Sequence, residues 1–336
     1  MKIDFAKRRR VIGQIQLLAC AFGFMGLSSC AAAPDRETAA STRPELEVSF
    51  NKEAGRGDWL YLTLCLENGE ELLFELDTGA PVTVLDKSLE PKLGKRLNKR
   101  TITYAWKKVT AGVYPAPELY LGKTRLLTGD QVWTDELSRN LCRPNPGRPV
   151  MGILGMDCLR HYCVQLDFSA GKIRFLAPDH PGDQGLGKAF QLALDHSGYV
   201  TIRENFTGSK GVTPIIDVGC LLDGVLEPKE FELELREQKA AWTNQAKDPR
   251  GFPRCTASLP NVVFGGETYT NFLIDKAPGM MGKGRPCYFN AIGLRFLARH
   301  LVTFDFPKRT MYLKRVSVGP LALPPLTSPA PGSTAK

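Results

Sequence analysis

The sequence has 336 residues, of which 43% are hydrophobic and 24% charged. This composition is typical of globular proteins, and the length allows two domains that each bury a core. The formal net charge is +9, but the first ten residues hold five cations and one acid. Because no later stretch groups Lys and Arg with aromatic residues on one face, we expect no nucleic-acid partner.

The N-terminal residues have the order of a secretory signal. The basic start is followed by an apolar run at 11–26, which is too short for a transmembrane helix. The ending Leu27-Ser28-Ser29-Cys30 resembles the bacterial lipobox, which implies cleavage before Cys30 and lipid on its thiol. A plain signal peptide that contains a Cys is the alternative, and Arg8-Arg9 loosely resembles a twin-arginine signal. We expect residues 1–30 to be a lipoprotein signal peptide and the protein to be anchored in the bacterial envelope, on the periplasmic side or the surface.

A flexible tether and a hairpin come next. Residues 31–45 are small, polar and Pro-containing, and predict a tether. Residues 58–77 alternate apolar and polar side chains around Asn68-Gly69, a strong β-hairpin pattern. The hairpin ends in Asp77-Thr78-Gly79-Ala80, which suggests an acid at the floor of a cleft. A single carboxylate cannot act as both acid and base, so this chemistry requires a second one.

A long internal repeat supplies the candidate. The segment that starts at Ile153 returns from Ala291: an apolar-Gly step, a short helix, a strand ending in Asp-Phe, a turn and another strand. Gly155 and Gly293 are 138 positions apart, as are Asp167 and Asp305. Such a period indicates a duplicated domain.

The repeat predicts a counterpart of Asp77 near residues 215 to 217. Asp217-Val218-Gly219 lies there, after an apolar strand. Asp77 precedes Gly155 by 78 positions and Asp217 precedes Gly293 by 76, so the two halves order their parts alike.

The remaining pattern is mostly strand, and we predict a mainly β protein with two lobes. The expected parts are lobes at 46–178 and 187–316, a linker at 179–187, brief helices near 156–161, 227–236 and 294–300, and a disordered Pro-rich tail at 317–336.

Several other residues have simpler interpretations. His161 and His300 repeat at helix ends and are expected to be structural, while Asp167 and Asp305 are expected to cap turns. No Cys-x-x-Cys or His-x-x-x-His spacing occurs, so we expect neither a metal nor a cofactor. Disulfides between Cys255 and Cys287, or between Cys142 and either Cys158 or Cys163, remain open.

These motifs together resemble the aspartic proteases of the pepsin and retropepsin clan. The resemblance implies two β-barrel lobes, a peptide or protein substrate bound in the cleft between them, and no cofactor. It also implies that Asp77 and Asp217 share one proton and activate water. The supporting loop residues would be Thr78, Gly79, Ala80, Val218 and Gly219. We expect a monomer, although pairing of first lobes from two chains is an alternative.

The second lobe departs from the family pattern. Val218 replaces a hydroxyl residue and can neither donate nor accept in the network between the lobes, and Cys220 stands where Ala80 stands in the first lobe. A second hypothesis is therefore an inactive lipoprotein that binds peptides or envelope proteins in the cleft.

The resemblance also implies a flap over the cleft. Residues 101–115 are the candidate, with Tyr104, Trp106 and Tyr114 available to stack on a substrate. The alternative is that these aromatic side chains form the core of a hairpin.

Overall fold

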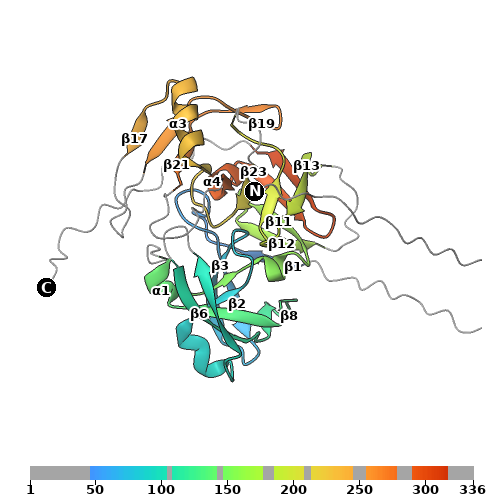
Figure 1. The fold of residues 1–336 in the computed structure, drawn as a ribbon. Helices are drawn as coiled ribbons and strands as arrows, with labels where there is room; N and C mark the ends of the chain where they lie inside the picture. Colours follow the sequence, from blue (N-terminus) through green and yellow to red (C-terminus); the bar gives the residue numbers. More distant parts are fainter. Residues whose placement is uncertain are drawn as a thin grey trace, which may run out of the picture. The chain divides into compact units, whose positions relative to one another are not determined.

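The computed structural model describes residues 46–103, 108–141, 147–176, 185–207, 213–244, 255–277 and 290–316. All of them belong to one compact unit, Thr42–Lys336, and its fold is mainly β (Figure 1). The expected signal peptide with Cys30, the tether and the tail lie outside the described residues, as do Tyr104 and Trp106.

We call the two parts of this unit the first half, β1 to β12, and the second half, β13 to β24. The strands of the first half are β1 (Leu46–Ser49), β2 (Tyr61–Leu66), β3 (Glu71–Leu76), β4 (Val84–Asp86), β5 (Asn98–Thr103), β6 (Lys108–Pro115), β7 (Leu119–Leu121), β8 (Thr124–Arg125), β9 (Gln131–Asp135), β10 (Val150–Leu154), β11 (Cys163–Asp167) and β12 (Lys172–Leu176). Those of the second half are β13 (Lys188–Leu194), β14 (Val200–Ile202), β15 (Ile215–Asp217), β16 (Gly224–Leu226), β17 (Trp242–Asn244), β18 (Thr256–Leu259), β19 (Val262–Phe264), β20 (Glu267–Tyr269), β21 (Phe272–Lys276), β22 (Ala291–Gly293), β23 (His300–Asp305) and β24 (Thr310–Arg315).

The strands form two large sheets and a small one. Nine strands of the first half follow the order β5-β6-β9-β4-β10-β3-β2-β7-β8, and β19 pairs with β20. The order of the other sheet is β1-β12-β11-β23-β24-β13-β14-β15-β22-β16-β21-β18-β17. Within the described residues both large sheets have open edges, so the prediction of closed barrels is wrong for them. The strands at the ends of each order pair on one side only.

Strand pairings of the first half recur in the second, shifted by twelve strands. In the first half β3 runs parallel to β10, which pairs antiparallel with β4. In the second half β15 runs parallel to β22, which pairs antiparallel with β16. The parallel pair matters for the site, because it brings the end of β10 or β22 beside the loop that follows β3 or β15.

The two halves meet where β11 pairs antiparallel with β23. Gln165 lies opposite Thr303 in this pair, and its side-chain amide donates a hydrogen bond of 3.0 Å to the Thr303 hydroxyl. These two residues are 138 positions apart, the offset of the sequence repeat. One continuous sheet therefore joins the halves.

The strands leading to the predicted site are anchored in the main hydrophobic core. Phe74 and Leu76 of β3 are buried in this core. Phe74 lies against Gly152 of β10, where any Cβ would overlap its ring. Burying one such aromatic side chain contributes roughly 1.5 to 3 kcal/mol to the free energy of unfolding. This packing holds β3, and with it the start of the loop that follows, in the core.

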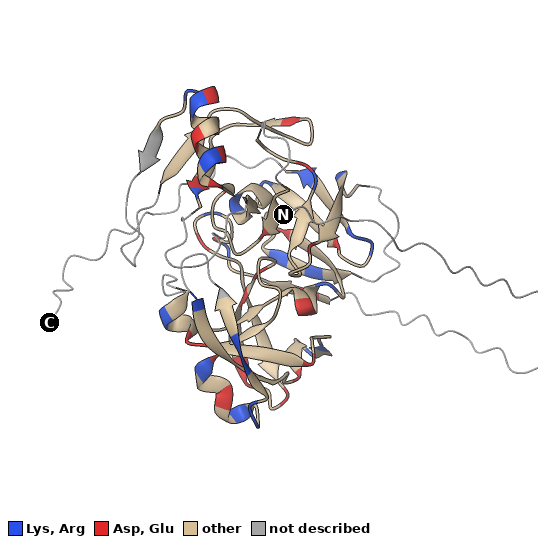
Figure 2. Ribbon diagram, in the orientation of Figure 1, with Lys and Arg blue, Asp and Glu red and all other residues tan. Residues whose placement is uncertain are grey.

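Helices are short, as predicted. They are η1 (Lys87–Lys92), α1 (Leu137–Asn140), α2 (Met156–Leu159), α3 (Pro228–Glu237) and α4 (Leu294–Leu297). The last three confirm the predicted positions: α2 and α4 are shorter than predicted, and α3 has the predicted length but begins one residue later. Of the residues that the structure describes, no helix is long and apolar enough to cross a membrane. Lys and Arg, like Asp and Glu, are scattered over the described elements of both halves (Figure 2).

Candidate active site

Asp77 begins the loop that follows β3. Its backbone N–H donates to the Leu154 carbonyl over 3.1 Å, which fixes the loop to the end of β10. Its carboxylate accepts a hydrogen bond of 2.7 Å from the Gly79 N–H. The carboxylate is therefore oriented by its own loop, and it remains partly exposed.

Gly155 passes directly beneath this loop. A Cβ at Gly155 would lie 2.7 Å from the backbone of Ala80 and Val82, a distance that real side chains do not adopt. The next residue, Met156, donates its N–H to the Ala80 carbonyl over 2.8 Å. The small residue allows this close backbone packing.

Asp217 is the last residue of β15 and leads into the corresponding loop. Its carbonyl accepts from the Cys220 N–H over 3.1 Å, and the Cys220 carbonyl accepts from the Leu294 N–H over 2.7 Å. A Cβ at Gly293 would lie 2.8 Å from that same carbonyl. Gly293 thus packs beneath the second loop as Gly155 packs beneath the first.

The two loops face each other across the halves. A Cβ at Gly79 would lie 2.6 Å from Oδ1 of Asp217, and a Cβ at Gly219 would lie 2.5 Å from Oδ1 of Asp77. Each carboxylate therefore lies against the glycine of the opposite loop, and the two approaches are nearly equal. Any side chain at either glycine would displace the opposing acid.

Thr78 provides hydrogen bonds between the loops. Its buried hydroxyl donates to the Ile216 carbonyl over 2.7 Å and accepts from the Val218 N–H over 3.0 Å. The sequence interpretation left Val218 outside this network. That is wrong for its backbone, since the interpretation considered only the side chain, which is fully buried.

Trp59 is a contact between the halves that the sequence interpretation missed. Its indole N–H donates to the Gly219 carbonyl over 2.9 Å, across 160 positions of sequence. No motif surrounds Trp59. The only available indication was its place at the start of the predicted hairpin.

The flap candidates are only partly described. The hairpin exists, because β5 pairs antiparallel with β6. Tyr114 is buried in the main core, and burial together with a hydrogen bond to Glu90 raises its pKa. Its position favours the hairpin-core alternative over stacking on a substrate.

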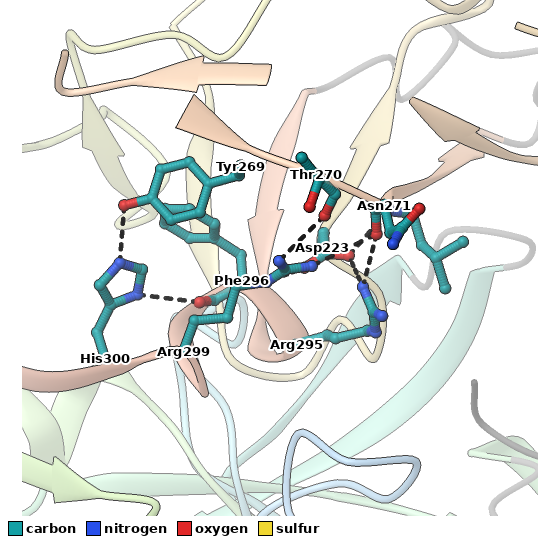
Figure 3. A network of polar contacts seen from close by, with 9 residues as sticks. Asp223, Tyr269, Thr270, Asn271, Arg295, Phe296, Arg299 and His300 are labelled. Atoms are coloured by element: carbon teal, nitrogen blue, oxygen red, sulfur yellow. Dashed lines mark hydrogen bonds and ion pairs between the residues drawn. The ribbon is translucent and has the colours of Figure 1, made fainter. Parts of the chain in front are cut away.

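A buried ionic network lies behind the second loop (Figure 3). Asp223 is fully buried, and its carboxylate accepts from Arg295 and from Arg299, the latter over 2.9 Å. The Leu273 N–H also donates to this carboxylate, over 2.8 Å. Burial raises the pKa of Asp223, and the two guanidinium groups oppose that rise.

The first half has a different pair at the matching place. Thr83 lies six positions after Asp77, just as Asp223 lies six positions after Asp217. The Thr83 hydroxyl donates a hydrogen bond of 2.7 Å to Asp157. Asp157 in turn occupies the position of Arg295, two residues after the glycine. In both halves, the residue before the strand that follows the acid loop therefore contacts the residue two positions after the glycine. The first half makes this contact with a hydroxyl, and the second makes it with an ion pair.

The remaining predicted residues have structural roles where the structure describes them. Asp167 accepts from the Ser169 and Ala170 N–H groups, and Asp305 from the Lys308 N–H, so both are turn caps. His300 is buried between the Tyr269 hydroxyl and the Phe296 carbonyl. None of the described parts of the chain contains three or more His, Cys, Asp or Glu side chains arranged to hold a metal ion.

The first half matches a known family. Residues 62–158 match the family model described as aspartyl protease. The match includes Asp77-Thr78-Gly79 and ends just beyond Gly155, the glycine beneath that loop. It supports an aspartic-type peptidase domain in the first half. Among curated proteins, no relative matches the chain.

Proposed function

We propose that the protein is an aspartic-type endopeptidase, with Asp77 and Asp217 as its acid/base pair. The observation that carries the proposal is the mutual approach of each carboxylate to the glycine of the opposite loop. The family match of residues 62–158 supports the same reaction class.

The proposed mechanism follows from the pairing of the two acids. Ionising both of two neighbouring carboxylates is unfavourable because the two negative charges repel each other. The pair therefore holds one proton and titrates in two coupled steps. The ionised member takes a proton from water as that water attacks the peptide carbonyl carbon. The protonated member donates its proton to the carbonyl oxygen, giving a tetrahedral diol without a covalent enzyme intermediate. The acid that took the proton of the water then gives it to the amide nitrogen, the other acid takes a proton from a diol hydroxyl, and the C–N bond breaks to release a carboxylic acid and an amine.

A single chain supplies both acids in this proposal. We infer that the halves arose by duplication, which is supported by the strand pairings that recur twelve strands later. The substrate would lie extended between the loops, and no second copy of the protein is needed for the pair.

We further propose that the protein is exported and held at the membrane by lipid on Cys30. This part rests on the basic start, the apolar run and the Leu27–Cys30 motif of the sequence.

The competing function is peptide or envelope-protein binding without cleavage. Val218 favours it, because the second loop lacks the hydroxyl that Thr78 supplies in the first. In this alternative, the cleft is retained while the acids no longer act together.

The test is cleavage of a mixed peptide library from pH 3 to pH 8 by the full-length chain in detergent. Asp77→Asn and Asp217→Asn should each abolish cleavage. Asp130→Asn, at an exposed position of the first half, is the matched control and should cleave like the wild type. Cleavage that survives Asp217→Asn would contradict the shared pair. Peptide binding without cleavage at any pH would establish the competing function.

A further inference from the structure

The segment Asn51–Trp59 of the first half reaches the second acid loop. Its last residue, Trp59, donates the indole N–H to the Gly219 carbonyl over 2.9 Å. Gly219 is two residues after Asp217 and lies against the Asp77 carboxylate. The indole therefore holds the part of the second loop that faces the first acid.

Trp59 is itself held in place by neighbouring polar groups. The Asn51 side-chain amide donates to the Trp59 carbonyl over 2.8 Å and accepts from the Tyr61 N–H, also over 2.8 Å. The Trp59 N–H donates to Asp58 over 2.8 Å. These bonds, all within the first half, fix the backbone on both sides of Trp59, from which its indole extends to the second half.

The same segment packs on the helix that follows Gly293. Gly55 has φ of +69°, and a Cβ there would lie 2.5 Å from the Cβ of Ala298 and 3.1 Å from the Leu294 carbonyl. Leu294 donates its N–H to Cys220 of the second loop. The segment thus contacts the second loop directly through Trp59. Through Gly55 it contacts the helix whose first residue, Leu294, is hydrogen-bonded to that loop.

Thr78 makes side-chain hydrogen bonds between the two acid loops, and Trp59 adds another from the first half. Val218 has no hydroxyl to contribute in return. We propose that Trp59, oriented by Asn51 and Asp58, is a positioning residue that holds the Asp217 loop against Asp77. This inference deepens the proposed function, because it concerns the same pair of acids.

The experiment removes the indole N–H in two ways, one that keeps the two-ring shape of the side chain and one that does not. In the full-length chain, Trp59 is replaced by 3-benzothienylalanine, in which sulfur stands for the N–H, and separately by Phe. Tyr162→Phe is the matched control, since it removes one hydrogen bond of an aromatic side chain, to the Leu127 N–H, within the first half. Thermal unfolding verifies that each variant is folded.

The first readout is independent of cleavage. Carboxyl ¹³C NMR follows the titration of Asp77 and Asp217, assigned with the Asn variants. We expect two separated transitions in the wild type and a smaller separation in both Trp59 variants, because a looser loop lets the carboxylates move apart. The second readout is peptide cleavage, where kcat should fall roughly three- to tenfold with KM unchanged, the effect typical of one hydrogen bond. Tyr162→Phe should change neither readout.

The outcomes separate this inference from the proposed function. Benzothienylalanine at position 59 with wild-type titration and wild-type kcat would overturn the role of Trp59. A wild type that titrates as a coupled pair but cleaves nothing would overturn only the proposed function, and the Trp59 titrations would still decide the inference. A wild type whose two acids titrate independently would overturn both.

Discussion

Replacing Thr78 by Val tests how strongly one hydroxyl holds the two halves together. Val has the same shape, so the change removes only the polar contacts of a side chain that is 1% exposed. The Ile216 carbonyl and the Val218 N–H both lose their hydroxyl partner. A buried backbone group left unsatisfied costs about 1 to 3 kcal/mol, so the two together cost about 2 to 6 kcal/mol. That is a large part of the 5 to 15 kcal/mol typical of a folded protein.

The assay is urea unfolding of the full-length chain, with Thr78→Ser as the control. Ser retains the hydroxyl and loses one methyl group, so its free energy of unfolding should fall by about 1 kcal/mol or less. A Thr78→Val loss below about 1 kcal/mol, or a loss equal to that of Ser, would refute the reasoning. It would mean that the hydroxyl is not the main contact between the loops.

Two further predictions concern the second half. Asp223→Asn leaves the buried Arg295 and the partly buried Arg299 without this counter-ion and should lower the free energy of unfolding by about 3 to 5 kcal/mol; unchanged thermal unfolding would contradict the ion pairing. His300 is expected to make stability pH-dependent, because burial lowers its pKa to about 4. Between pH 6.5 and pH 4 the unfolded state binds the proton and the folded state does not, so stability falls by about 3 kcal/mol as the pH drops through this window. His300→Gln should flatten that slope in unfolding measured from pH 7 to pH 4, and an unchanged slope would exclude His300 as its cause.

The sequence predicts the acid loops because each combines a short local pattern with a glycine at a repeated spacing. An apolar strand, the turn residues and a distant glycine recur at nearly constant offsets, and the structure brings the four segments together as that order implies. Helices α2 and α4 also lie where the repeat puts them, since a short apolar pattern after a glycine is a local property.

Contacts made across the halves are much harder to predict. Trp59 and Gly219 are 160 positions apart, and neither residue type indicates the other. The repeat does not help, because the position of Trp59 in the first half corresponds to Tyr199 in the second. The Val218 N–H was missed for another reason: backbone groups are present at every position, so their partners depend on tertiary structure.

The Asp223 network illustrates a third limit. Thr83 with Asp157 and Asp223 with Arg295 occupy matching places, yet neither matching position carries the same residue type in both halves. A repeat search compares residue types, so it finds no similarity at these positions. Both pairs nevertheless join the same elements. The structure conserves the contact between elements, while its chemistry changes from a hydroxyl to an ion pair.

The absence of a hydroxyl at position 218 leads to the last prediction. If the loops are equivalent, a hydroxyl at 218 should reach the Leu76 carbonyl and the Thr78 N–H, the counterparts of the groups that Thr78 contacts. Val218→Thr should then raise the free energy of unfolding by about 1 to 2 kcal/mol, for two added hydrogen bonds. A buried hydroxyl without partners would instead lower it by about 1 to 3 kcal/mol.

Moving the hydroxyl from one loop to the other makes this test sharper. The double variant Thr78→Val with Val218→Thr keeps one hydroxyl between the halves but supplies it from the second. Equivalent loops predict that urea unfolding of the double variant recovers at least half of the Thr78→Val loss. If the double variant is less stable than Thr78→Val alone, the second loop cannot use a hydroxyl. The loops would then differ in backbone geometry. In that case a hydroxyl at position 218 could not hold the second loop, and Trp59 would hold it instead.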